Sequence, residues 1–359
     1  MTRVVVAMSG GIDSSVAALE LKDKGYEAVG VTIKTWPGPE RGDSPGGTRD
    51  PADAIRSARG AAKDMGIPHR VIDLSKEFSE EVTDHFASEY ARGRTPNPCV
   101  YCNSRIKFGH LYRRAAGMGA DRIATGHYAR LVRRGKEHYL AEARDLEKDQ
   151  SYFLYGISRE ILPFIDFPLS EYTKDEVRTI AMERGITASA RRESQDVCFA
   201  DAPGDYRGYL VKTGLQAFSP GDILNVDGDV IGQHNGIASY TVGQRRGVGV
   251  AMGEPVYVLK ISSRANTITV GRREHAMERR IRVSGLNWLV SDRPDGQGEF
   301  QVRVRYSGRK ARAIVALHGE SDAIVEFFEP QFALTPGQAA VFYDGSIVAG
   351  GGVIEEVLD

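Results

Sequence analysis

The chain has 359 residues, more than a single hydrophobic core usually organises, so we expect two or three domains. Hydrophobic residues make up 41% of it, yet no apolar run approaches membrane-spanning length, which argues for a soluble globular protein. The three cysteines lack the number and spacing of a disulfide framework, and Met1-Thr2-Arg3 leads straight into a predicted strand, which leaves no room for a signal peptide. These features predict a cytoplasmic protein with reduced thiols.

The N-terminal half alternates apolar, strand-like runs with helical patterns. The predicted elements are strand 4–8, helix 14–24, strand 27–35, helix 51–65, strand 69–74, helix 79–92, helix 106–118 and strand 122–126. This alternation predicts the α/β class, with a doubly wound, mostly parallel sheet that binds its ligand at the carboxyl ends of the strands. Residues 38–51, rich in glycine, proline and charge, are predicted to form a mobile surface loop beside that edge.

The pattern changes in the second half. Residues 128–143 predict a hairpin around Gly135, and a helix over 173–184 begins with a capping-box pattern and ends at Gly185. Short strands are predicted at 222–225, 256–260, 267–270, 301–306, 311–317, 323–328, 339–343 and 347–351. We therefore divide the chain into an N-terminal α/β domain (1–200), a small central β-rich domain (201–275) and a C-terminal β-barrel domain (276–359).

The turn after the first strand carries a clear chemical signal, Ser9-Gly10-Gly11-Ile12-Asp13-Ser14-Ser15. Two adjacent glycines permit positive φ and inward-pointing amides, and the following helix adds free N–H groups and the positive end of its dipole. Such a cradle suits phosphate. Asp13 is predicted either to hold a cation beside the phosphates or to cap the helix. The string resembles the pyrophosphatase loop of ATP-dependent adenylating enzymes, which place AMP on a carbonyl oxygen.

A second informative stretch surrounds two of the cysteines, Thr95-Pro96-Asn97-Pro98-Cys99-Val100-Tyr101-Cys102-Asn103. The two prolines stiffen it. A Cys-x-x-Cys pair in this setting is a redox pair, half of a metal site, or a catalytic thiol near a helix N-terminus, where the thiol pKa falls. Only Cys198 remains in the chain, so a structural zinc site lacks its second pair. Taken alone, Cys198 fits a small buried apolar side chain.

The net charge of −1 hides a basic region. Between Lys260 and Arg312 there are thirteen Lys or Arg against five Asp or Glu, which leaves the rest of the chain acidic. Within it, Arg303-Val304-Arg305-Tyr306 alternates as a strand does, so both arginines are predicted to face one side and to follow phosphates. The region favours a polyanion as partner; the alternative is a solvated surface on which both signs are interspersed.

Several motifs occur in one order along the chain, and together they resemble the bacterial tRNA-specific 2-thiouridylase family. They are Ser-Gly-Gly-Ile-Asp-Ser at 9–14, Gly-Arg-Thr-Pro-Asn-Pro-Cys-x-x-Cys-Asn at 93–103 with Ile-Lys-Phe at 106–108, Ala-Thr-Gly-His-Tyr at 124–128, Lys-Asp-Gln-Ser-Tyr-Phe-Leu at 148–154, Gly-Gln-Arg-Arg-Gly at 243–247, Thr-Pro-Gly-Gln at 335–338 and Val-Phe-Tyr at 341–343.

The resemblance implies a sulfurtransferase that replaces the oxygen on carbon-2 of the wobble uridine (position 34) with sulfur, using ATP, Mg²⁺ and a protein persulfide. It implies that Cys198 carries the persulfide. Cys102 is implied as the catalytic cysteine, either as nucleophile or as the thiol that releases the sulfur by forming a disulfide with Cys198. The implied partners are tRNA and a sulfur-relay protein or cysteine desulfurase, with no membrane.

The resemblance also implies binding residues. Those for ATP are Ala7, Met8, Ser9, Gly10, Gly11, Ile12, Asp13, Ser14, Ile33 and Gly126. Those for tRNA are Asn97, Pro98, Cys99, His127, Lys148, Asp149, Gln150, Arg305, Tyr306 and Gln338. Glycine at 126 is expected because a Cβ would obstruct the nucleotide.

Some alternatives stay open. Some relatives carry aspartate where this chain has Cys99, and the three thiols Cys99, Cys102 and Cys198 could instead ligate an iron–sulfur cluster; persulfide chemistry is favoured. Tyr101, Tyr128 and Tyr306 are candidate stacking surfaces for an extruded base, but core or surface packing explains each at least as well. His127 likewise fits a core histidine.

Two rival functions remain. Another pyrophosphatase-loop synthetase or amidotransferase acting on a small molecule would explain residues 1–35, but it needs neither the cysteines nor a basic β domain. A non-catalytic RNA-binding protein would need no intact phosphate loop.

Overall fold

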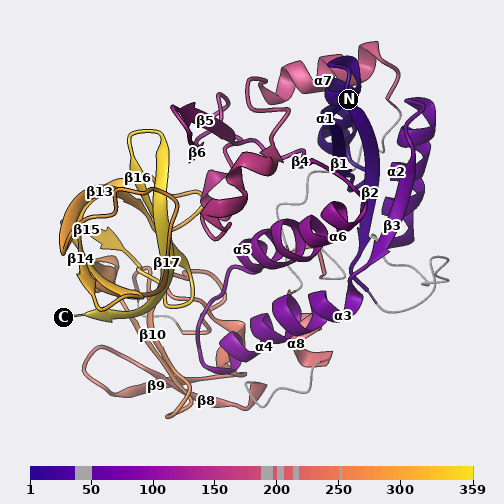
Figure 1. Ribbon diagram of the computed structural model, residues 1–359. Coiled ribbons are helices and arrows are strands. Elements are labelled where there is room, and N and C mark those ends of the chain that lie inside the picture. Colours follow the sequence, from indigo (N-terminus) through magenta and orange to yellow (C-terminus); the bar gives the residue numbers. More distant parts are fainter. Residues whose placement is uncertain (37–50, 187–196, 200–205, 213–217, 251–252, 359) are drawn as a thin grey trace. The chain divides into compact units, whose positions relative to one another are not determined.

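A computed structural model describes residues 1–36, 51–186, 197–199, 206–212, 218–250 and 253–358 (Figure 1). They form two compact units. The first comprises Met1–Val82, Cys99–Asp196 and Ser346–Val348; the second comprises Thr83–Pro98, Val197–Gly345 and Ala349–Asp359. Each unit draws on segments far apart in sequence, a different division from the three consecutive domains expected above. The predicted loop at 38–51 lies outside the described residues, except for its last residue.

The first unit is built on a five-stranded parallel sheet. Its order is β3 (His69–Asp73), β2 (Glu27–Lys34), β1 (Arg3–Ala7), β4 (Arg122–Thr125) and β7 (Ile165–Asp166). The chain runs outward from β1 to β3 and then returns to place β4 on the other side of β1. This reversal makes the carboxyl ends of β1 and β4 the place where such a sheet binds ligands. The predicted fold class is therefore confirmed.

Helices α1 (Ile12–Asp23), α2 (Pro51–Asp64) and α7 (Lys174–Glu183) belong to the same unit. Val4 and Val6 of β1 share a buried core with one alanine and two leucines of α1 and with alanines of α2, because alternate strand residues point to one face. Figure 1 shows α1 beside α7. The hairpin of β5 (Arg130–Arg134) and β6 (Glu137–Ala141) turns at Gly135, whose φ is +61°, as predicted.

Two helical runs begin earlier than predicted. One consists of α3 (Ser75–Phe78), a π-helical turn η1 (Ser79–Thr83) and α4 (Asp84–Ala91). The other consists of α5 (Pro98–Tyr101), a π-helical stretch η2 (Cys102–Leu111) and α6 (Tyr112–Gly117), where the sequence predicted a helix only from 106. Proline at the first helical position is preorganised and lacks only an N–H that would be unpaired there. Cys99 and Cys102 therefore lie in a helix and not in a loop.

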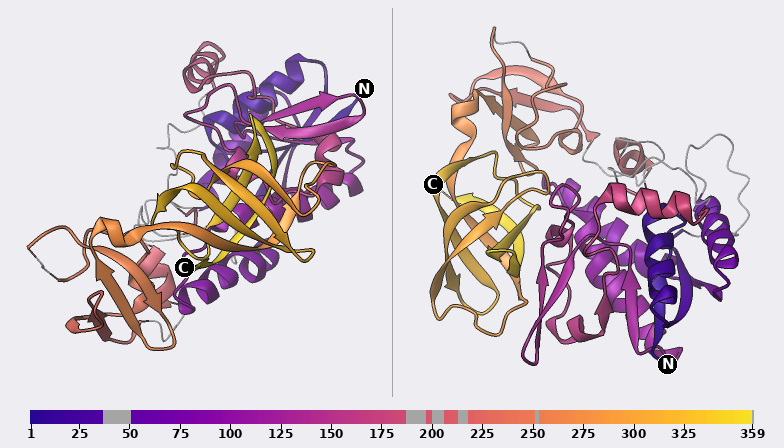
Figure 2. Two further views of the ribbon diagram at one scale, coloured as in Figure 1. Left: turned by 90° about the vertical axis from the view of Figure 1, so that its left-hand side faces the viewer. Right: turned by 90° about the horizontal axis from the view of Figure 1, so that it is seen from above.

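The second unit contains a closed antiparallel barrel. Its strands are β12 (Met277–Trp288), β13 (Gln297–Arg303), β14 (Ala311–His318), β15 (Asp322–Phe332), β16 (Ala339–Asp344) and β17 (Ile347–Leu358), drawn in orange and yellow in Figure 2. Pairing of β12 with both β15 and β17 closes the ring. Alternate residues such as Ile281, Val283, Val315 and Val325 fill the interior. Ser346–Val348, at the start of β17, belong to the first unit, in which Ile347 pairs with Ala141 of β6.

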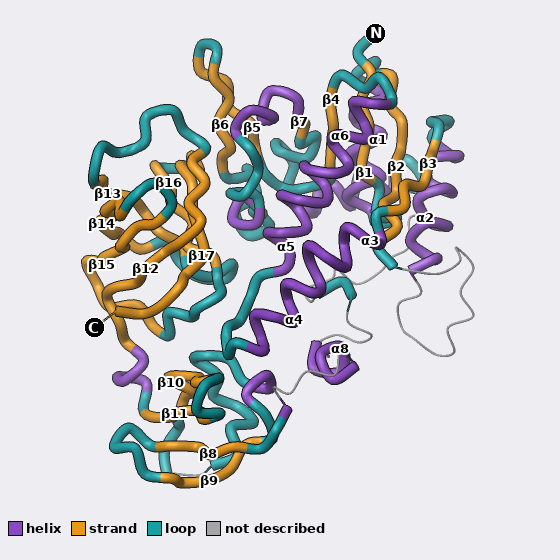
Figure 3. The backbone as a smooth tube through the Cα atoms, turned by 60° about the horizontal axis from the view of Figure 1, so that its bottom comes forward, coloured by secondary structure: helices purple, strands orange, loops and turns teal. Residues whose placement is uncertain are grey.

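A four-stranded sheet completes the second unit, in the order β10 (Tyr257–Ser262), β11 (Thr267–Gly271), β8 (Gly221–Leu224) and β9 (Val230–His234) (Figure 3). Helix α8 (Tyr206–Lys212) and α4 share a buried cluster with it. The sequence predictions missed β9 and the long strand β12. Several short 3-10 helices complete the described chain: η3 (Ser151–Phe153), η4 (Arg159–Phe164), η6 (Ile237–Ser239) and η7 (Arg273–Ala276). Among the described residues, no helix is long and apolar enough to cross a membrane.

Candidate active site

The two glycines of the phosphate loop have different roles. Gly10 has φ +78°, and a Cβ there would lie 2.5 Å from the carbonyl oxygen of Ala54. Gly11 is the extended N-cap of α1, with φ −93°, and a Cβ there would meet only the Ser9 hydroxyl at 3.6 Å. The expectation that both glycines supply positive φ is therefore wrong for Gly11. Only Gly10 requires glycine, because it has a left-handed backbone and a close backbone neighbour.

Serine side chains hold the loop in shape. Ser14 Oγ accepts a hydrogen bond from the Ser9 amide at 3.1 Å and donates to the Gly11 carbonyl at 3.1 Å. Ser15 Oγ donates to the same carbonyl at 3.0 Å. The first backbone bond of α1 runs from the Ser15 amide, so within the described chain the amides of Gly11, Ile12 and Asp13 find no acceptor. These N–H groups at a helix N-terminus fit an anionic phosphate.

Asp13 is neither a helix cap nor open to solvent on all sides. Both of its carboxylate oxygens accept from Lys174 Nζ at 2.7 Å, and Oδ1 also accepts from the Tyr128 hydroxyl at 3.0 Å. Lys174 begins α7, whose capping box between Thr173 and Glu176 is present as predicted. The sequence pointed to this helix start but not to Lys174, which is buried and whose contact with Asp13 spans 161 residues.

Gly126 and Ile33 lie where neighbouring strands end. Gly126 follows β4, and a Cβ there would lie 2.8 Å from the Ser14 amide nitrogen and 2.9 Å from the Asp13 carbonyl carbon. Close packing of β4 against the first turn of α1 is by itself a reason for glycine, and the expected clash with a nucleotide stays a prediction. Ile33 is the last but one residue of β2 and pairs with Ile72.

The thiol-bearing helix is joined to a buried polar network in the first unit. Asn103, next to Cys102, donates to the Phe153 carbonyl at 3.1 Å, and Lys107 Nζ donates to Asn103 Oδ1 at 2.9 Å. Lys107 Nζ also lies 3.3 Å from His127 Nε2. An ammonium only donates, so Nε2 must be the acceptor and the ring proton lies on Nδ1, 2.7 Å from Thr125 Oγ1.

The electrostatics of this network follow from burial and from Lys107. Burial holds the pKa of His127 well below its usual value, and the charge of Lys107 acts in the same direction. Burial raises the pKa of the Cys102 thiol, while Lys107 opposes that shift. Cys99 is partly exposed to water, but protein atoms surround most of its side chain. The resulting desolvation raises the pKa of its thiol to about 11, and the charge of Lys107 opposes this shift.

His127 and Tyr128 link this network to the phosphate loop. The Tyr128 amide donates to Gln150 Oε1 at 3.0 Å, and its hydroxyl donates to Asp13. Asp149 is buried and accepts from the Ala143 amide and from Ser151, so its carboxylate stabilises the turn that carries Lys148 and Gln150. Tyr128 is buried, which matches the core interpretation and not a stacking surface. Whether His127, Lys148, Asp149 and Gln150 contact tRNA stays a prediction.

Cys198 belongs to the second unit. It is exposed, and all three cysteines of the chain are reduced thiols. The ring of the adjacent Phe199 packs edge-on against Phe86 of α4, with centroids 5.1 Å apart, and against Tyr209 of α8 at 5.0 Å. Considered without the family resemblance, Cys198 was expected to be a buried apolar side chain, and this expectation is wrong. The neighbouring Phe199 packs into the apolar cluster, and Cys198 is left exposed. Residues 187–196, which precede Val197, lie outside the described chain.

The segment that leads to the thiol helix is anchored within the second unit. Gln338 Nε2 donates to the Thr95 carbonyl at 2.8 Å, and the Thr95 amide donates to the Pro336 carbonyl at 2.9 Å. Arg94 pairs with Glu355 at 2.5 Å and with Glu89 at 2.7 Å. Asn97 is half-buried and Pro98 buried at the end of this segment. Contacts of Asn97, Pro98, Cys99 and Gln338 with tRNA stay predictions.

The basic region is more neutral in three dimensions than in sequence. Strand β13 ends at Arg303, so the predicted strand through Tyr306 is wrong and Arg303 and Arg305 do not share a strand face. Arg305 donates to the carbonyl of Ala333 and to the Thr335 hydroxyl, and so fixes a turn. Carboxylates from outside the stretch pair with Arg280 and Arg282. Tyr306 remains exposed.

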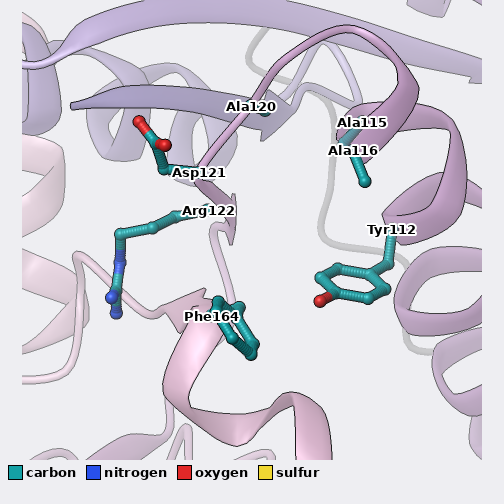
Figure 4. Close-up of a pocket in the computed structure, with 7 residues that line it drawn as sticks. All are labelled: Tyr112, Ala115, Ala116, Ala120, Asp121, Arg122 and Phe164. Carbon is teal, nitrogen blue, oxygen red and sulfur yellow. The ribbon is translucent and has the colours of Figure 1, made fainter.

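Other possible sites give little. Among the described residues, no three His, Cys, Asp or Glu side chains gather as metal ligands. A cavity of about 320 Å³ lies where β4 begins, lined by Tyr112, Ala115, Ala116, Ala120, Asp121, Arg122 and Phe164 (Figure 4). Arg122 begins β4, so this cavity is at the opposite end of the strand from the phosphate loop. Arg122 forms an ion pair with Asp166, and Asp121 accepts a hydrogen bond from the Arg3 amide.

Comparison with known proteins places these features in a family. Models described as the tRNA methyl transferase HUP domain, the tRNA methyl transferase PRC-barrel domain and the aminomethyltransferase β-barrel domain match residues 2–202, 210–272 and 278–354. Proteins named tRNA-specific 2-thiouridylase from Syntrophotalea carbinolica and Pelotomaculum thermopropionicum are each 43% identical, over 98% and 100% of this chain and 98% of their own. A third tRNA-specific 2-thiouridylase, from Caldanaerobacter subterraneus, is 40% identical, and the match covers 99% of this chain and 98% of the relative.

Among solved structures, a 4-thiouridine synthetase–RNA complex with bound ATP is 21% identical with a TM-score of 0.38, covering 59% of this chain and 50% of that one. The near-complete coverage by relatives with one name is the decisive finding. The chain belongs to the tRNA-specific 2-thiouridylase family.

Proposed function

We propose that this protein is an ATP-dependent sulfurtransferase that thiolates carbon-2 of the wobble uridine of tRNA. The observation that carries the proposal is the network that joins the phosphate loop to the thiol helix within the first unit. Asp13 binds Tyr128, and the adjacent His127 binds Lys107, five residues after Cys102. Side chains of the phosphate loop and of the thiol-bearing helix thus meet neighbouring residues of one segment, which suits activation of an oxygen followed by its replacement with sulfur.

The phosphate loop and the ends of β1 and β4 are proposed to bind ATP. ATP supplies an adenylyl group that turns the uracil oxygen into a good leaving group. The amides of Gly11, Ile12 and Asp13 would hold phosphate oxygens, and Gly10 would keep the backbone in the required turn. Asp13 fits Mg²⁺ chemically, as a carboxylate beside phosphates, but it is already paired with Lys174. Lys174 is therefore expected to move or to share Asp13 when the cation binds.

The sulfur step is proposed to use two thiols. A persulfide on Cys198 attacks carbon-2, and AMP leaves with the former uracil oxygen. The Cys102 thiolate then attacks Cys198 Sγ, the bond between Cys198 and the transferred sulfur breaks, and its electron pair stays on the sulfur of 2-thiouridine. The products are thiolated tRNA and a Cys102–Cys198 disulfide, which a dithiol reductant converts back to two thiols. A sulfur-relay protein or cysteine desulfurase renews the persulfide.

The proposal treats two parts of the second unit as RNA-facing. Tyr306 is exposed and suits an unstacked base, whereas the Tyr343 ring is buried in the barrel. Lys310 Nζ and the Arg303 guanidinium lie 4.9 and 5.4 Å from the centroid of that buried ring, and these basic groups suit phosphates. An iron–sulfur mechanism rests on the sequence alone, because the described residues show no metal-ligand cluster.

Mass spectrometry of tRNA incubated with the protein, ATP, Mg²⁺ and a protein persulfide as sulfur donor tests the proposal. The expected result is a mass gain equal to the difference between sulfur and oxygen, located on the wobble uridine. Unmodified tRNA would contradict it. The family models carry methyl transferase names, so a methyl-group gain with a methyl donor would point to that chemistry instead. ATP–pyrophosphate exchange with a small molecule and no tRNA would favour a small-molecule synthetase.

A further inference from the structure

Lys107 differs from Arg105, His110 and Arg114 on its helical run, which meet carboxylates. Arg105 and His110 meet Glu81 at 4.0 and 2.6 Å, and Arg114 meets Glu77 at 3.9 Å. Lys107 is half-buried, and in the part of the chain that the structure describes no carboxylate pairs with it. Its ammonium group therefore lies in a partly desolvated place where neutral groups, and not an anion, surround it.

Neutral groups hold that ammonium in position. Asn103 Oδ1 accepts from it at 2.9 Å, and Asn103 is itself held by its bond to the Phe153 carbonyl. His127 Nε2 accepts at 3.3 Å, and burial keeps that imidazole neutral by lowering its pKa. Because both partners are uncharged, they orient the ammonium without cancelling its charge, and the field extends to neighbouring groups.

The neighbours that lack a charge of their own are the thiols. Cys102 lies five residues before Lys107, and Cys99 three residues before Cys102. Lys107 lowers the pKa of Cys102 against the effect of burial, and it acts on Cys99 in the same direction. On other sides of the helix, Glu81 is engaged by Arg105 and His110, and His127 is neutral. Cys102 and Lys107 both lie in the π-helical stretch η2, in which residues i and i+5 are one turn apart. The cation therefore lies one helical turn from Cys102, a group that becomes an anion only by losing a proton.

We infer that Lys107 is the fixed positive charge that holds an anionic sulfur at Cys102, with Asn103 and His127 as its neutral supports. When Cys102 ionises, its proton passes to solvent and the ammonium balances the new charge. Lys107 is a positioning residue for the thiol, and Asn103 and His127 position Lys107. The role in turnover rests on the proposed sulfur transfer, but the charge effect itself exists without tRNA and is measured separately.

The direct test follows alkylation of Cys102 by iodoacetamide as a function of pH. The background is Cys99→Ser with Cys198→Ser, which leaves Cys102 as the sole thiol of the chain. Lys107→Gln is expected to raise the apparent pKa of Cys102 by about one unit, equivalent to tenfold less thiolate below that pKa. The greater nucleophilicity of the more basic thiolate offsets part of this, so alkylation slows about threefold to fourfold.

Two matched variants act as controls. Lys107→Arg keeps the charge and should keep the parental pH profile. Arg105→Gln removes a charge two residues away that is engaged by Glu81, and it should leave the profile unchanged. If Lys107→Gln is not folded by circular dichroism, Lys107→Met removes the same charge while it keeps a long side chain in the half-buried position.

The same variant in the wild-type background separates this inference from the proposed function. Lys107→Gln should lose thiolation at neutral pH and regain part of it as the pH rises, since alkaline solution restores the thiolate. A folded Lys107→Gln or Lys107→Met protein with the parental alkylation profile would overturn the inference. Absence of thiolation by the wild type, with the alkylation shift still present, would overturn the proposed function alone.

Discussion

Cys102 and Cys198 occupy opposite kinds of surroundings. Cys102 lies in a helix of the first unit, beside a buried network of Asn103, Lys107 and His127. Cys198 lies at the surface of the second unit, beside Phe199, which packs against Phe86 and Tyr209. An exposed thiol suits exchange with a donor protein, whereas an enclosed thiol near an ammonium suits a step protected from solvent. The difference predicts distinct roles for two residues of the same chemistry.

Removing each thiol in turn tests whether the two cysteines have distinct roles. Cys198→Ser and Cys102→Ser are both expected to lower thiolation at least about 100-fold, because each removes a reacting sulfur. With a labelled protein persulfide as donor, Cys102→Ser should retain label on Cys198, and Cys198→Ser should retain none; peptide mass spectrometry reads this. Label on Cys102 in the Cys198→Ser protein would contradict the division of roles.

The phosphate loop should act separately from both thiols. Gly10→Ala is expected to weaken ATP binding roughly tenfold or more, since a left-handed alanine costs about 1–2 kcal/mol and its Cβ would press on the Ala54 carbonyl. Gly11→Ala is the matched control and should bind ATP nearly normally, because its Cβ meets only ordinary contacts. Calorimetric titration with a non-hydrolysable ATP analogue measures both. Equal affinities for the two variants would show that the loop changes shape when it binds nucleotide.

The anchor of Cys198 gives a smaller effect. Phe199→Ala removes the ring that fixes the turn, and thiolation is expected to fall about tenfold through misplacement of the thiol. Alkylation of Cys102 should not change. Phe328→Ala serves as control, because it truncates an exposed ring elsewhere in the second unit. If both truncations lower thiolation equally, the Phe199 contact has no special part in placing Cys198.

The smallest effect concerns the pH dependence of stability. Burial lowers the pKa of His127 in the folded protein, so below the ordinary value of 6.5 the unfolded chain binds a proton that the folded chain does not. Stability should therefore be fully present above that pH and fall as the pH decreases, by at most about 1.4 kcal/mol per pH unit for this group. The free energy of unfolding can be measured with urea at several pH values from about 7.5 to about 5.5. It should depend less steeply on pH in His127→Gln than in the wild type. His69 and His234, whose pKa values are also lowered, would maintain the remaining slope. An unchanged slope would mean that His127 is solvated in the folded state.

Much of the fold could be predicted from local patterns. The strands of the parallel sheet follow from buried apolar runs, the hairpin from alternation around Gly135, and α7 from its capping box. Periodic burial and turn chemistry act over a few residues, so the sequence displays them directly. The long strand β12 was missed because charged residues alternate with its buried Ile281 and Val283 within a region that we interpreted only by its charge.

Other features depended on contacts that local patterns do not contain. The helix that begins at Pro98 was predicted to start later, because its first residues read as a proline-rich loop. Arg305 was predicted to follow phosphates from a strand, but the strand ends before it and its guanidinium binds a turn at Ala333. Glycine at 126 was attributed to a nucleotide, although the backbone of α1 already excludes a Cβ there.

The sequence by itself determined the chemistry of the site: a Gly-Gly turn between strand and helix, and cysteines in the order expected of a sulfurtransferase. Only the tertiary structure decided which charges meet. Lys174 reaches Asp13 across 161 residues, and Lys107 meets no carboxylate among the described residues while Arg280 and Arg282 acquire carboxylates from other strands. The physical reason is that residue types and their spacing are local properties, whereas the partner and the desolvation of a charge depend on which distant segments fold beside it.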